Sequence, residues 1–176
     1  MNAFTKILLG VCCILAFAAP LAAQHRDPLN EAESDQLREV AQEPYKRLKL
    51  MIKFATQRLD TVEAAQKDSQ SRGRGQRVHD ALQDFRQLVD ELDDNIDDFV
   101  QKQSDLRKAL NEVISAESGF ESRLKGIKSA AESPKLADEY KMYSFALQDA
   151  MEAVNLSLED SKKTLDEQTT SMTKKK

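Results

Sequence analysis

VHDALQDFRQLVDELDDNIDDFVQKQSDLRKALNEVISAESGFESRLKGIKSAA, residues 78–131, carries one apolar repeat from end to end. Steps that alternate between four and three residues land almost always on an apolar side chain. A helix has about 3.6 residues per turn, so a repeat of about 3.5 residues held over this length predicts a helix packed along other helices. We call these positions the seam: Val78, Leu82, Phe85, Val89, Leu92, Ile96, Phe99, Gln103, Leu106, Leu110, Val113, Glu117, Phe120, Leu124, Ile127 and Ala131.

Two seam positions, Gln103 and Glu117, are polar. A polar residue at one core position can fix the register or the oligomeric state of packed helices. The alternative is that the side chain reaches the surface near a bundle end or a bend. For Glu117, close to Gly119, we expect it to reach the surface, and for Gln103 both interpretations stay open. Because the repeat survives Gly119 and Gly126, we expect one continuous helix that bends at Gly119.

Glycine and proline are scarce, so the few that occur indicate the turns. Residues 69–75 (SQSRGRG) form one polar loop, and Ser133-Pro134 forms a second. These two turns divide the chain into helical segments at about residues 28–68, 78–131 and 136–168. A proline inside a helix removes a backbone hydrogen bond, so we expect a kink or short break at Glu43-Pro44.

The first segment has a seam and, beside it, a second apolar stripe formed by Leu50 and Phe54. A two-stranded coil has no use for a second stripe, whereas a bundle of three or more helices does. The sequence therefore predicts an all-α fold, an elongated antiparallel three-helix bundle with long coiled-coil-like helices. This domain spans residues 24–168, and residues 169–176 are predicted to be a disordered C-terminal tail.

The first 23 residues are typical of a secretory signal peptide. Lys6 precedes a short apolar stretch, and the small residues that follow suggest cleavage after Ala23. The stretch is shorter than the roughly 20 residues that cross a bilayer. Cys12 and Cys13 suggest a lipidated protein instead, but both lie inside the apolar stretch and neither follows a small residue. We therefore expect cleavage without lipidation and a periplasmic or secreted location.

After that cleavage the chain contains no cysteine, because Cys12 and Cys13 are the two that the sequence has. An exported protein without disulfides is common in bacterial periplasms. The net charge of the full chain is −4, and the loss of Lys6 makes it more negative, which disfavours a nucleic-acid partner. We expect no stable membrane insertion after cleavage, since no other apolar run reaches membrane length.

The acidic run from Asp90 to Asp98 (DELDDNIDD) is the strongest candidate for a ligand site. Carboxylates at 90, 94 and 97 or 98 share one helical face, and hard cations take several oxygen ligands. However, no glycine turn folds the run into a loop, and carboxylates on a straight helix diverge. Most of these acids fall on outer positions of the repeat, where a charged run is usually a solvated face. We therefore expect no metal site.

A structural use of the acidic run is the preferred interpretation. If residues 69–75 fold the second helix back on the first, a basic run lies opposite residues 91–98. Such complementarity favours one register, although each exposed pair contributes only about 0.2–1 kcal/mol. The other interpretation is that the acidic and basic runs are solvated surfaces with no structural role. The basic run consists of Lys46, Arg47, Lys49 and Lys53.

No catalytic or cofactor motif is found. The two histidines are His25, near the predicted new N-terminus, and His79, which has Asp80 and Asp84 nearby but no histidine at helical spacing. No haem, ferritin-like or nucleophile-elbow motif is present. We therefore expect a non-catalytic protein without a cofactor, which binds an envelope protein or itself as a scaffold, spacer or holdase-type chaperone. The alternative is a metal- or small-ligand-binding bundle that uses the acidic run.

Overall fold

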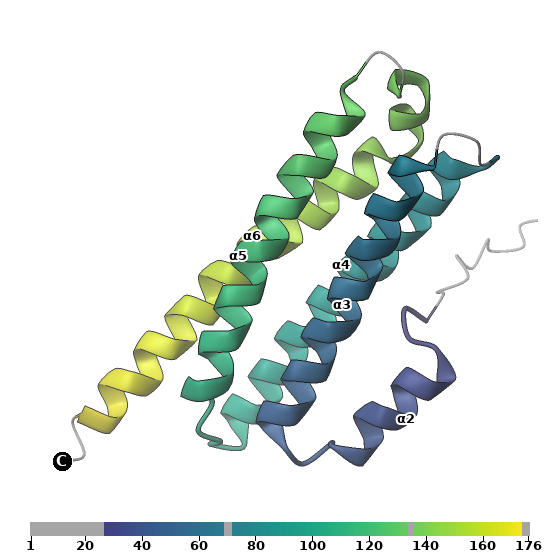
Figure 1. Ribbon diagram of the computed structural model, residues 1–176. Coiled ribbons are helices and arrows are strands. Elements are labelled where there is room, and N and C mark those ends of the chain that lie inside the picture. Colours follow the sequence, from purple (N-terminus) through teal and green to yellow (C-terminus); the bar gives the residue numbers. More distant parts are fainter. Residues whose placement is uncertain (1–26, 69–71, 134–135, 174–176) are drawn as a thin grey trace, which may run out of the picture.

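The computed structural model describes residues 27–68, 72–133 and 136–173, and these form five packed helices without a strand. The four long helices run alternately up and down (Figure 1). Helix α3 packs on α4 and α5, α6 packs on the same two helices, and the short α2 packs on α3. The predicted helical bundle is confirmed, but it has four long helices rather than three. The helices are α2 (Glu31–Glu39), α3 (Pro44–Lys67), α4 (Arg74–Gln101), α5 (Arg107–Ala131) and α6 (Ala137–Thr173).

The additional helix arises because the long predicted helix stops at Gln101 and restarts at Arg107. Gln103 adopts a left-handed backbone with φ 58°, and the Ser104 N–H donates back to the Phe99 carbonyl at 3.0 Å. This bond satisfies a carbonyl that the helix end leaves without a partner. The expectation of one continuous helix over residues 78–131 is therefore wrong, and Gln103 belongs to a turn.

The end of α6 closes this turn. The Gln168 side chain accepts a hydrogen bond from the Leu106 N–H at 2.9 Å and donates one to the Ser104 carbonyl at 3.1 Å. Helix α6 continues to Thr173, so residues 169–173 are helical where the sequence predicted a disordered tail. The predicted signal peptide, with Cys12 and Cys13, lies outside the described residues. Among the helices that are described, none combines the length and the apolarity needed to cross a membrane.

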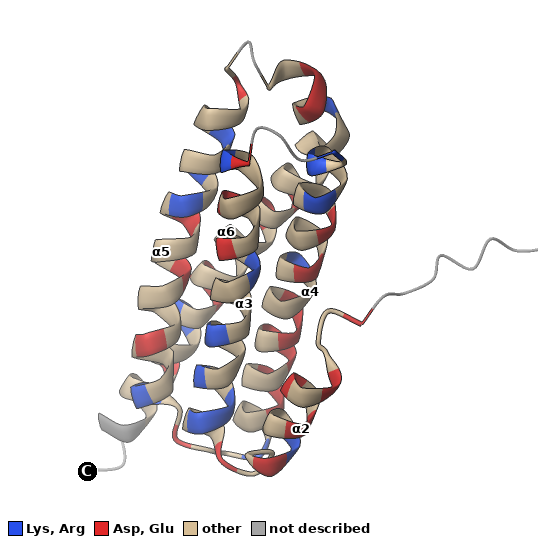
Figure 2. Cartoon of the chain, turned by 45° about the vertical axis from the view of Figure 1, so that its right-hand side comes forward, with Lys and Arg blue, Asp and Glu red and all other residues tan. Residues whose placement is uncertain are grey.

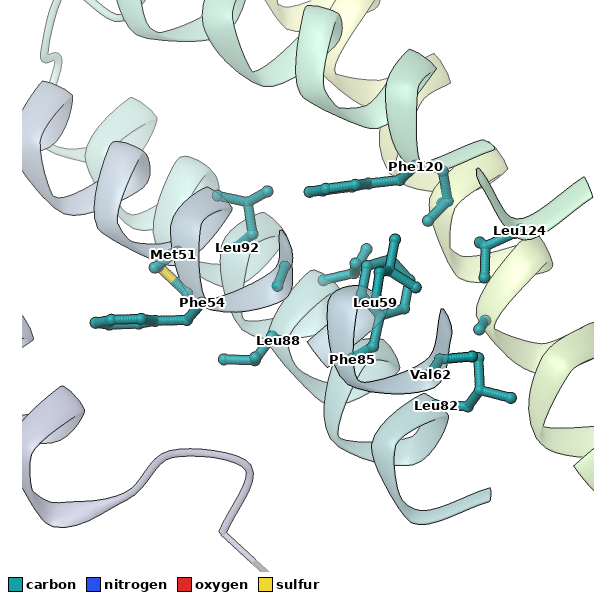
Figure 3. Packing of buried hydrophobic residues seen from close by; sticks show 14 of the residues in the cluster. Met51, Phe54, Leu59, Val62, Leu82, Phe85, Leu88, Leu92, Phe120 and Leu124 are labelled. Carbon is teal, nitrogen blue, oxygen red and sulfur yellow. The ribbon is translucent and has the colours of Figure 1, made fainter. Parts of the chain in front are cut away.

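The seam itself is confirmed. Every seam residue from Val78 to Ala131 is buried except Gln103, and α5 passes Gly119 and Gly126 without a break. Phe85 of α4 and Phe120 of α5 meet edge to face, with ring centroids 5.3 Å apart and planes at 90°. Leucine, valine and phenylalanine side chains from α3, α4 and α5 surround this pair (Figure 3). The bundle therefore has one continuous apolar core.

The predicted break at Glu43-Pro44 is also confirmed. Helix α2 ends before it, and Pro44 is the first residue of α3, where its missing N–H costs nothing. Asn30 and Glu33 form a capping box at the start of α2, in which each side chain accepts from the other residue's N–H. The short helix therefore begins and ends at identifiable residues.

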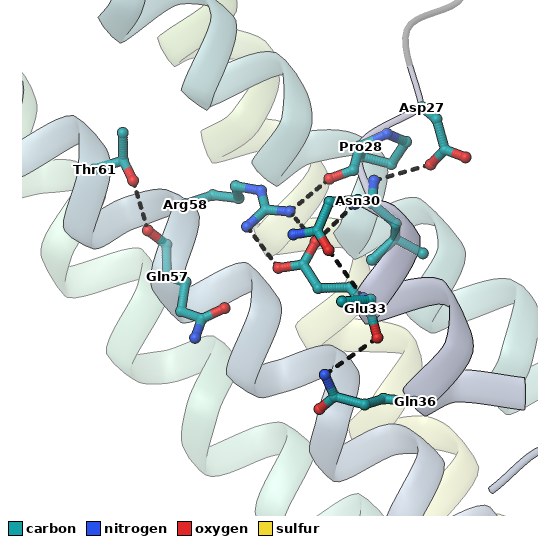
Figure 4. A network of polar contacts seen from close by, with 10 residues as sticks. Asp27, Pro28, Asn30, Glu33, Gln36, Gln57, Arg58 and Thr61 are labelled. Carbon is teal, nitrogen blue, oxygen red and sulfur yellow. Dashed lines mark hydrogen bonds and ion pairs between the residues drawn. The ribbon is translucent and has the colours of Figure 1, made fainter. Parts of the chain in front are cut away.

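Two arginines of α3 hold α2 against the bundle. The Arg58 guanidinium donates to both carboxylate oxygens of Glu33 and to the Pro28 carbonyl, which lies 2.7 Å away (Figure 4). At the other end of α2, Arg47 donates to the Leu37 carbonyl at 2.8 Å. Glu33 is buried, and Arg58 holds its pKa below the usual range against the opposing effect of burial. An arginine–carboxylate pair with two bonds also fixes orientation.

We expect Phe85→Ala to lower the free energy of unfolding by about 3–5 kcal/mol, because it leaves a cavity in the bundle core and removes the contact with Phe120. Urea denaturation followed by circular dichroism measures this. Phe145→Ala, at a phenylalanine that is 79% exposed, is the matched control and should change the value by less than about 0.5 kcal/mol. Equal effects of the two substitutions would contradict the packing described above.

Glu33→Ala should detach α2 without unfolding the bundle, because it removes both the partner of Arg58 and half of the capping box. Amide hydrogen exchange is the appropriate measurement. The amides of α2 should exchange at least about tenfold faster, while those in the middle of α4 keep their protection. Glu31→Ala, at an exposed acid in the same turn, serves as the control. Uniform loss of protection in all five helices would show that α2 is not a separate unit.

Candidate functional site

The hairpin of α3 and α4 has nearly the predicted register. The prediction places Arg47 opposite Asp97, and in the structure Arg47 Nε donates to the Asn95 side chain, two residues away. The expectation that the basic and acidic runs lie side by side on packed helices is therefore correct to within about half a helical turn.

The predicted pairing of charges between these runs is wrong. Lys46 pairs with Glu43, and Lys49 pairs with Glu112 of α5. Asp90 pairs with Arg86 of α4, and Asp98 pairs with Lys102, the residue that follows α4. Acidic α4 residues and the lysines of α3 occupy different sides of the two helices (Figure 2). The runs therefore do not hold the register through ion pairs.

Among the described residues, no group of three or more histidine, cysteine, aspartate or glutamate side chains is placed so that it could hold a metal ion. Asp90 and Asp98 point to their own helix partners. His79 contacts its neighbour Asp80, with Nδ1 3.2 Å from the carboxylate oxygen. His25 lies outside the described residues. Among the acids of the run, Asp93 is the one that contacts a side chain of α6, Ser157.

Asp93 belongs to a polar cluster inside the bundle that the sequence did not reveal. Ser157 of α6 lies between two carboxyl groups, 2.6 Å from Asp93 Oδ1 of α4 and in hydrogen-bond contact with Glu117 Oε1 of α5. Ser161 Oγ is 3.4 Å from the same Glu117 oxygen. Glu117 has no exposed surface, so the expectation that it reaches the surface is wrong.

Within the described residues, the Ser157 hydroxyl faces both carboxyl groups of the cluster, and the Ser161 hydroxyl faces Glu117 alone. The second carboxyl oxygen of Glu117, Oε2, is buried without a hydrogen-bond partner. A hydroxyl donates one hydrogen bond, so Ser157 can satisfy only one of its two acidic neighbours as a donor. The other contact becomes a hydrogen bond when that carboxyl is protonated and donates to the hydroxyl oxygen. Burial raises the pKa of Glu117 to about 7, and burial together with nearby Asp160 raises the pKa of Asp93 to about 6. We infer that protonated Glu117 donates to Ser157, which donates to Asp93.

The outer face of α6 carries large apolar side chains in contact with water. Phe145 is 79% exposed, Leu156 is 57% exposed and Met142 is 53% exposed. Phe145 and Leu156 are eleven residues apart, about three helical turns, so they lie on one face of α6. Single exposed apolar residues are ordinary on protein surfaces, but a row of them on one face indicates an interaction surface.

A groove of about 560 Å³ runs along this face between α6 and α5. Phe145 and Leu156 line it together with Leu147 and Met151, and Lys128 of α5 lies on its other side. The α6 residues of this surface carry only negative charge, because residues 142–161 contain Asp149, Glu152, Glu159 and Asp160 and neither lysine nor arginine. We call Phe145, Asp149, Glu152, Leu156 and Glu159 the α6 outer face.

The start of α6 is held firmly, so this face has a fixed position. The Arg74 guanidinium of α4 donates to both oxygens of Glu139, at 2.5 and 2.6 Å. Gly75 permits the close approach of α6, because a Cβ atom there would lie 2.8 Å from the Met142 sulfur. The outer face was not predicted, although the sequence contains a signal for it: Phe145 and Leu156 are large apolar residues three helical turns apart, on a different side of the helix from the buried Leu147, Val154 and Leu158.

Comparisons of the chain with protein-family models, with curated proteins and with solved structures give no match.

Glu117→Gln should remove part of the pH dependence of stability. The pKa of Glu117 is raised from 4.5 to about 7, so the folded chain binds the proton more tightly than the unfolded chain. This contribution is fully present below about pH 4.5 and is lost as the pH rises through about 7, because the stability change follows the difference in bound protons. The amide side chain stays neutral at every pH and can still donate to Ser157.

Urea denaturation at several pH values tests this. The difference between the free energies of unfolding, Glu117→Gln minus wild type, should increase by about 2–3 kcal/mol between about pH 4 and pH 8, at about 1.4 kcal/mol per pKa unit. The control, Glu132→Gln, replaces an exposed acid just after α5 and should show no such trend. A constant difference for Glu117→Gln would contradict the shared-proton arrangement.

Proposed function

We propose that this chain is an exported, non-catalytic helical protein that acts by binding another protein through the α6 outer face. The observation that carries the proposal is Phe145, an aromatic side chain almost fully in water at the rim of a groove. Its alignment with Leu156 gives two apolar anchors on a rigid helix. Interfaces concentrate their binding energy in a few such anchors, with aromatic residues enriched among them.

The chemistry of this face suggests the kind of partner. A helix that places apolar residues between Phe145 and Leu156 would cover both anchors and fill the groove above Met151. Basic side chains flanking that apolar stripe would meet Asp149, Glu152 and Glu159. The partner is thus an amphipathic, basic helical segment. A scaffold or spacer would hold it permanently, and a holdase would release it.

The alternative function is a metal- or small-ligand-binding bundle that uses the acidic run. It has less support, because Asp90 and Asp98 already have ion-pair partners on α4 and Asp93 is directed to Ser157. A titration of the protein with calcium, magnesium, manganese and zinc, followed by calorimetry, tests this alternative directly. Heat of binding that disappears in Asp93→Asn and Asp97→Asn variants would favour it.

The proposal predicts that Phe145→Ser with Leu156→Ser prevents capture of partner protein. The mature chain, immobilised through its C-terminus, should retain discrete proteins from an envelope extract, and the double variant should lose at least about nine-tenths of each, as expected for hot-spot residues. Val100→Ser, at an exposed apolar residue of α4, is the matched control and should bind normally. Equal capture by the double variant and the wild-type chain would remove the α6 outer face from the proposal.

A further inference from the structure

We propose that a second copy of this chain occupies the α6 outer face, and that it does so with a basic groove on its α3. The inference rests on the proposed function, since it takes the α6 outer face to be a protein-binding surface. It adds the identity of one occupant and the residues that receive it. The α6 outer face and the groove on α3 are opposite in charge. Their charged and apolar residues have the same spacing along the helix.

The groove on α3 is apolar along its floor and basic along its rim. It has a volume of about 590 Å³ and reaches from the end of α2 to α5. The side chains that line it are Val40, Leu50, Ile52, Lys46, Lys49, Lys53 and Glu112. An apolar floor with cationic edges suits a ligand that has an apolar stripe between negative charges. The α6 outer face has this composition.

The lysines of the groove remain able to change partners. Lys46 pairs with Glu43 one turn away, at 2.6 Å, and both side chains are more than half exposed. Lys49 is 3.8 Å from Glu112, also at an exposed position. Lys53 is exposed and lies over the Phe54 ring, 5.8 Å from its centroid. Exposed pairs of this kind contribute little, so an incoming carboxylate can replace them at small cost.

The spacing of the two surfaces fixes a register. On α3, Lys46, Leu50 and Lys53 stand at positions i, i+4 and i+7 of one helical face. On α6, Glu152, Leu156 and Glu159 stand at the same three positions. When the two helices lie parallel, two acid–lysine pairs flank one leucine–leucine contact. In an antiparallel arrangement the same charged residues can pair, but Leu50 then lies opposite position 155 and is displaced by one residue from Leu156.

The same register gives Phe145 a place. Phe145 precedes Glu152 by seven residues, about two turns of α6, so in this register it extends past the first residue of α3, Pro44. Val40 lines the end of the groove where α2 stops and α3 begins. The most exposed aromatic side chain of one copy thus reaches apolar surface on the other. Charged pairs would set the register, and the burial of Phe145 and Leu156 would supply the affinity.

A chain cannot satisfy this contact by itself. Within one molecule α6 packs on α4 and α5, and its hydrogen bond with α3, from Gln66 to Tyr143 at 3.5 Å, lies at the end of α3 away from the groove. The two surfaces are different, so each contact leaves a free groove on one copy and a free α6 outer face on the other. Heterologous contacts of this type form rings when the rotation closes and open filaments when it does not.

Charge exchange between the two surfaces tests the inference by sedimentation velocity of the purified mature protein. The wild-type chain should form species larger than a monomer as its concentration rises. The groove variant (Lys46→Glu, Lys53→Glu) and the face variant (Glu152→Lys, Glu159→Lys) should each self-associate at least about tenfold more weakly, because like charges then meet. Lys67→Glu with Lys125→Glu, at exposed lysines that line neither groove, is the control and should behave as wild type.

Two restorations make the test specific. The groove variant and the face variant should form complexes when they are mixed. The groove variant keeps an intact α6 outer face, and this face can bind the intact groove of the face variant. A chain with all four substitutions should recover self-association, since its reversed groove attracts its reversed face. Circular dichroism of every variant confirms that it is folded.

The outcomes separate this inference from the function on which it rests. A wild-type chain that stays monomeric at high concentration, or single-surface variants that assemble like wild type, would overturn the inference. If the monomeric chain still captured envelope proteins and lost them on Phe145→Ser with Leu156→Ser, the proposed function would stand without it. If self-association followed the charge exchange but no other protein was captured, the second copy would be the protein that the α6 outer face binds.

Discussion

The structure depends on keeping one apolar seam away from water along its whole length. Each square ångström of apolar surface that leaves water contributes about 25 cal/mol, and a two-helix hairpin would leave the second apolar stripe, which includes Leu50 and Phe54, exposed. Four helices enclose it, because every seam position then faces two neighbours across the core. The Phe85–Phe120 pair joins the two halves of the seam across the middle of the bundle. Helix α2, which contributes little to this core, needs arginine pairs to stay in place.

The same seam explains which parts of the fold were predictable. Burial follows from periodicity, so the buried face of α4 and α5 could be read from residues 78–131, and Pro44 gave the break before α3. Periodicity does not report the direction of the chain. A turn that leaves Phe99 and Leu106 facing the same core keeps the repeat in phase, so residues 102–106 look like helix. Gln103 alone indicated the turn, and its side chain is compatible with helix as well as with a left-handed backbone.

The candidate sites were less predictable, because the spacing along one helix does not say which helix lies opposite. Lys49 and Asp90 belong to neighbouring helices yet have different partners, Glu112 of α5 for the lysine and Arg86 of α4 for the aspartate. The same limit of prediction applies to Glu117 in the core. The repeat places Glu117 in the seam, but its burial depends on the hydroxyls of Ser157 and Ser161 of α6, which the spacing along α5 does not reveal. A buried carboxyl is stable only where neighbours satisfy it. That information is distributed over three helices.

Helix α6 buries apolar residues such as Leu147 and Val154, but it departs from a simple amphipathic helix at several positions. Its inner face includes Ser157, Ser161 and Gln168, while Phe145 and Leu156 point outward. Hydroxyls inside bury less apolar area than leucines would, so this half of the bundle core gains less from packing. The apolar residues outside regain that contribution only when another surface covers them. Both features support the proposal that another surface covers the α6 outer face.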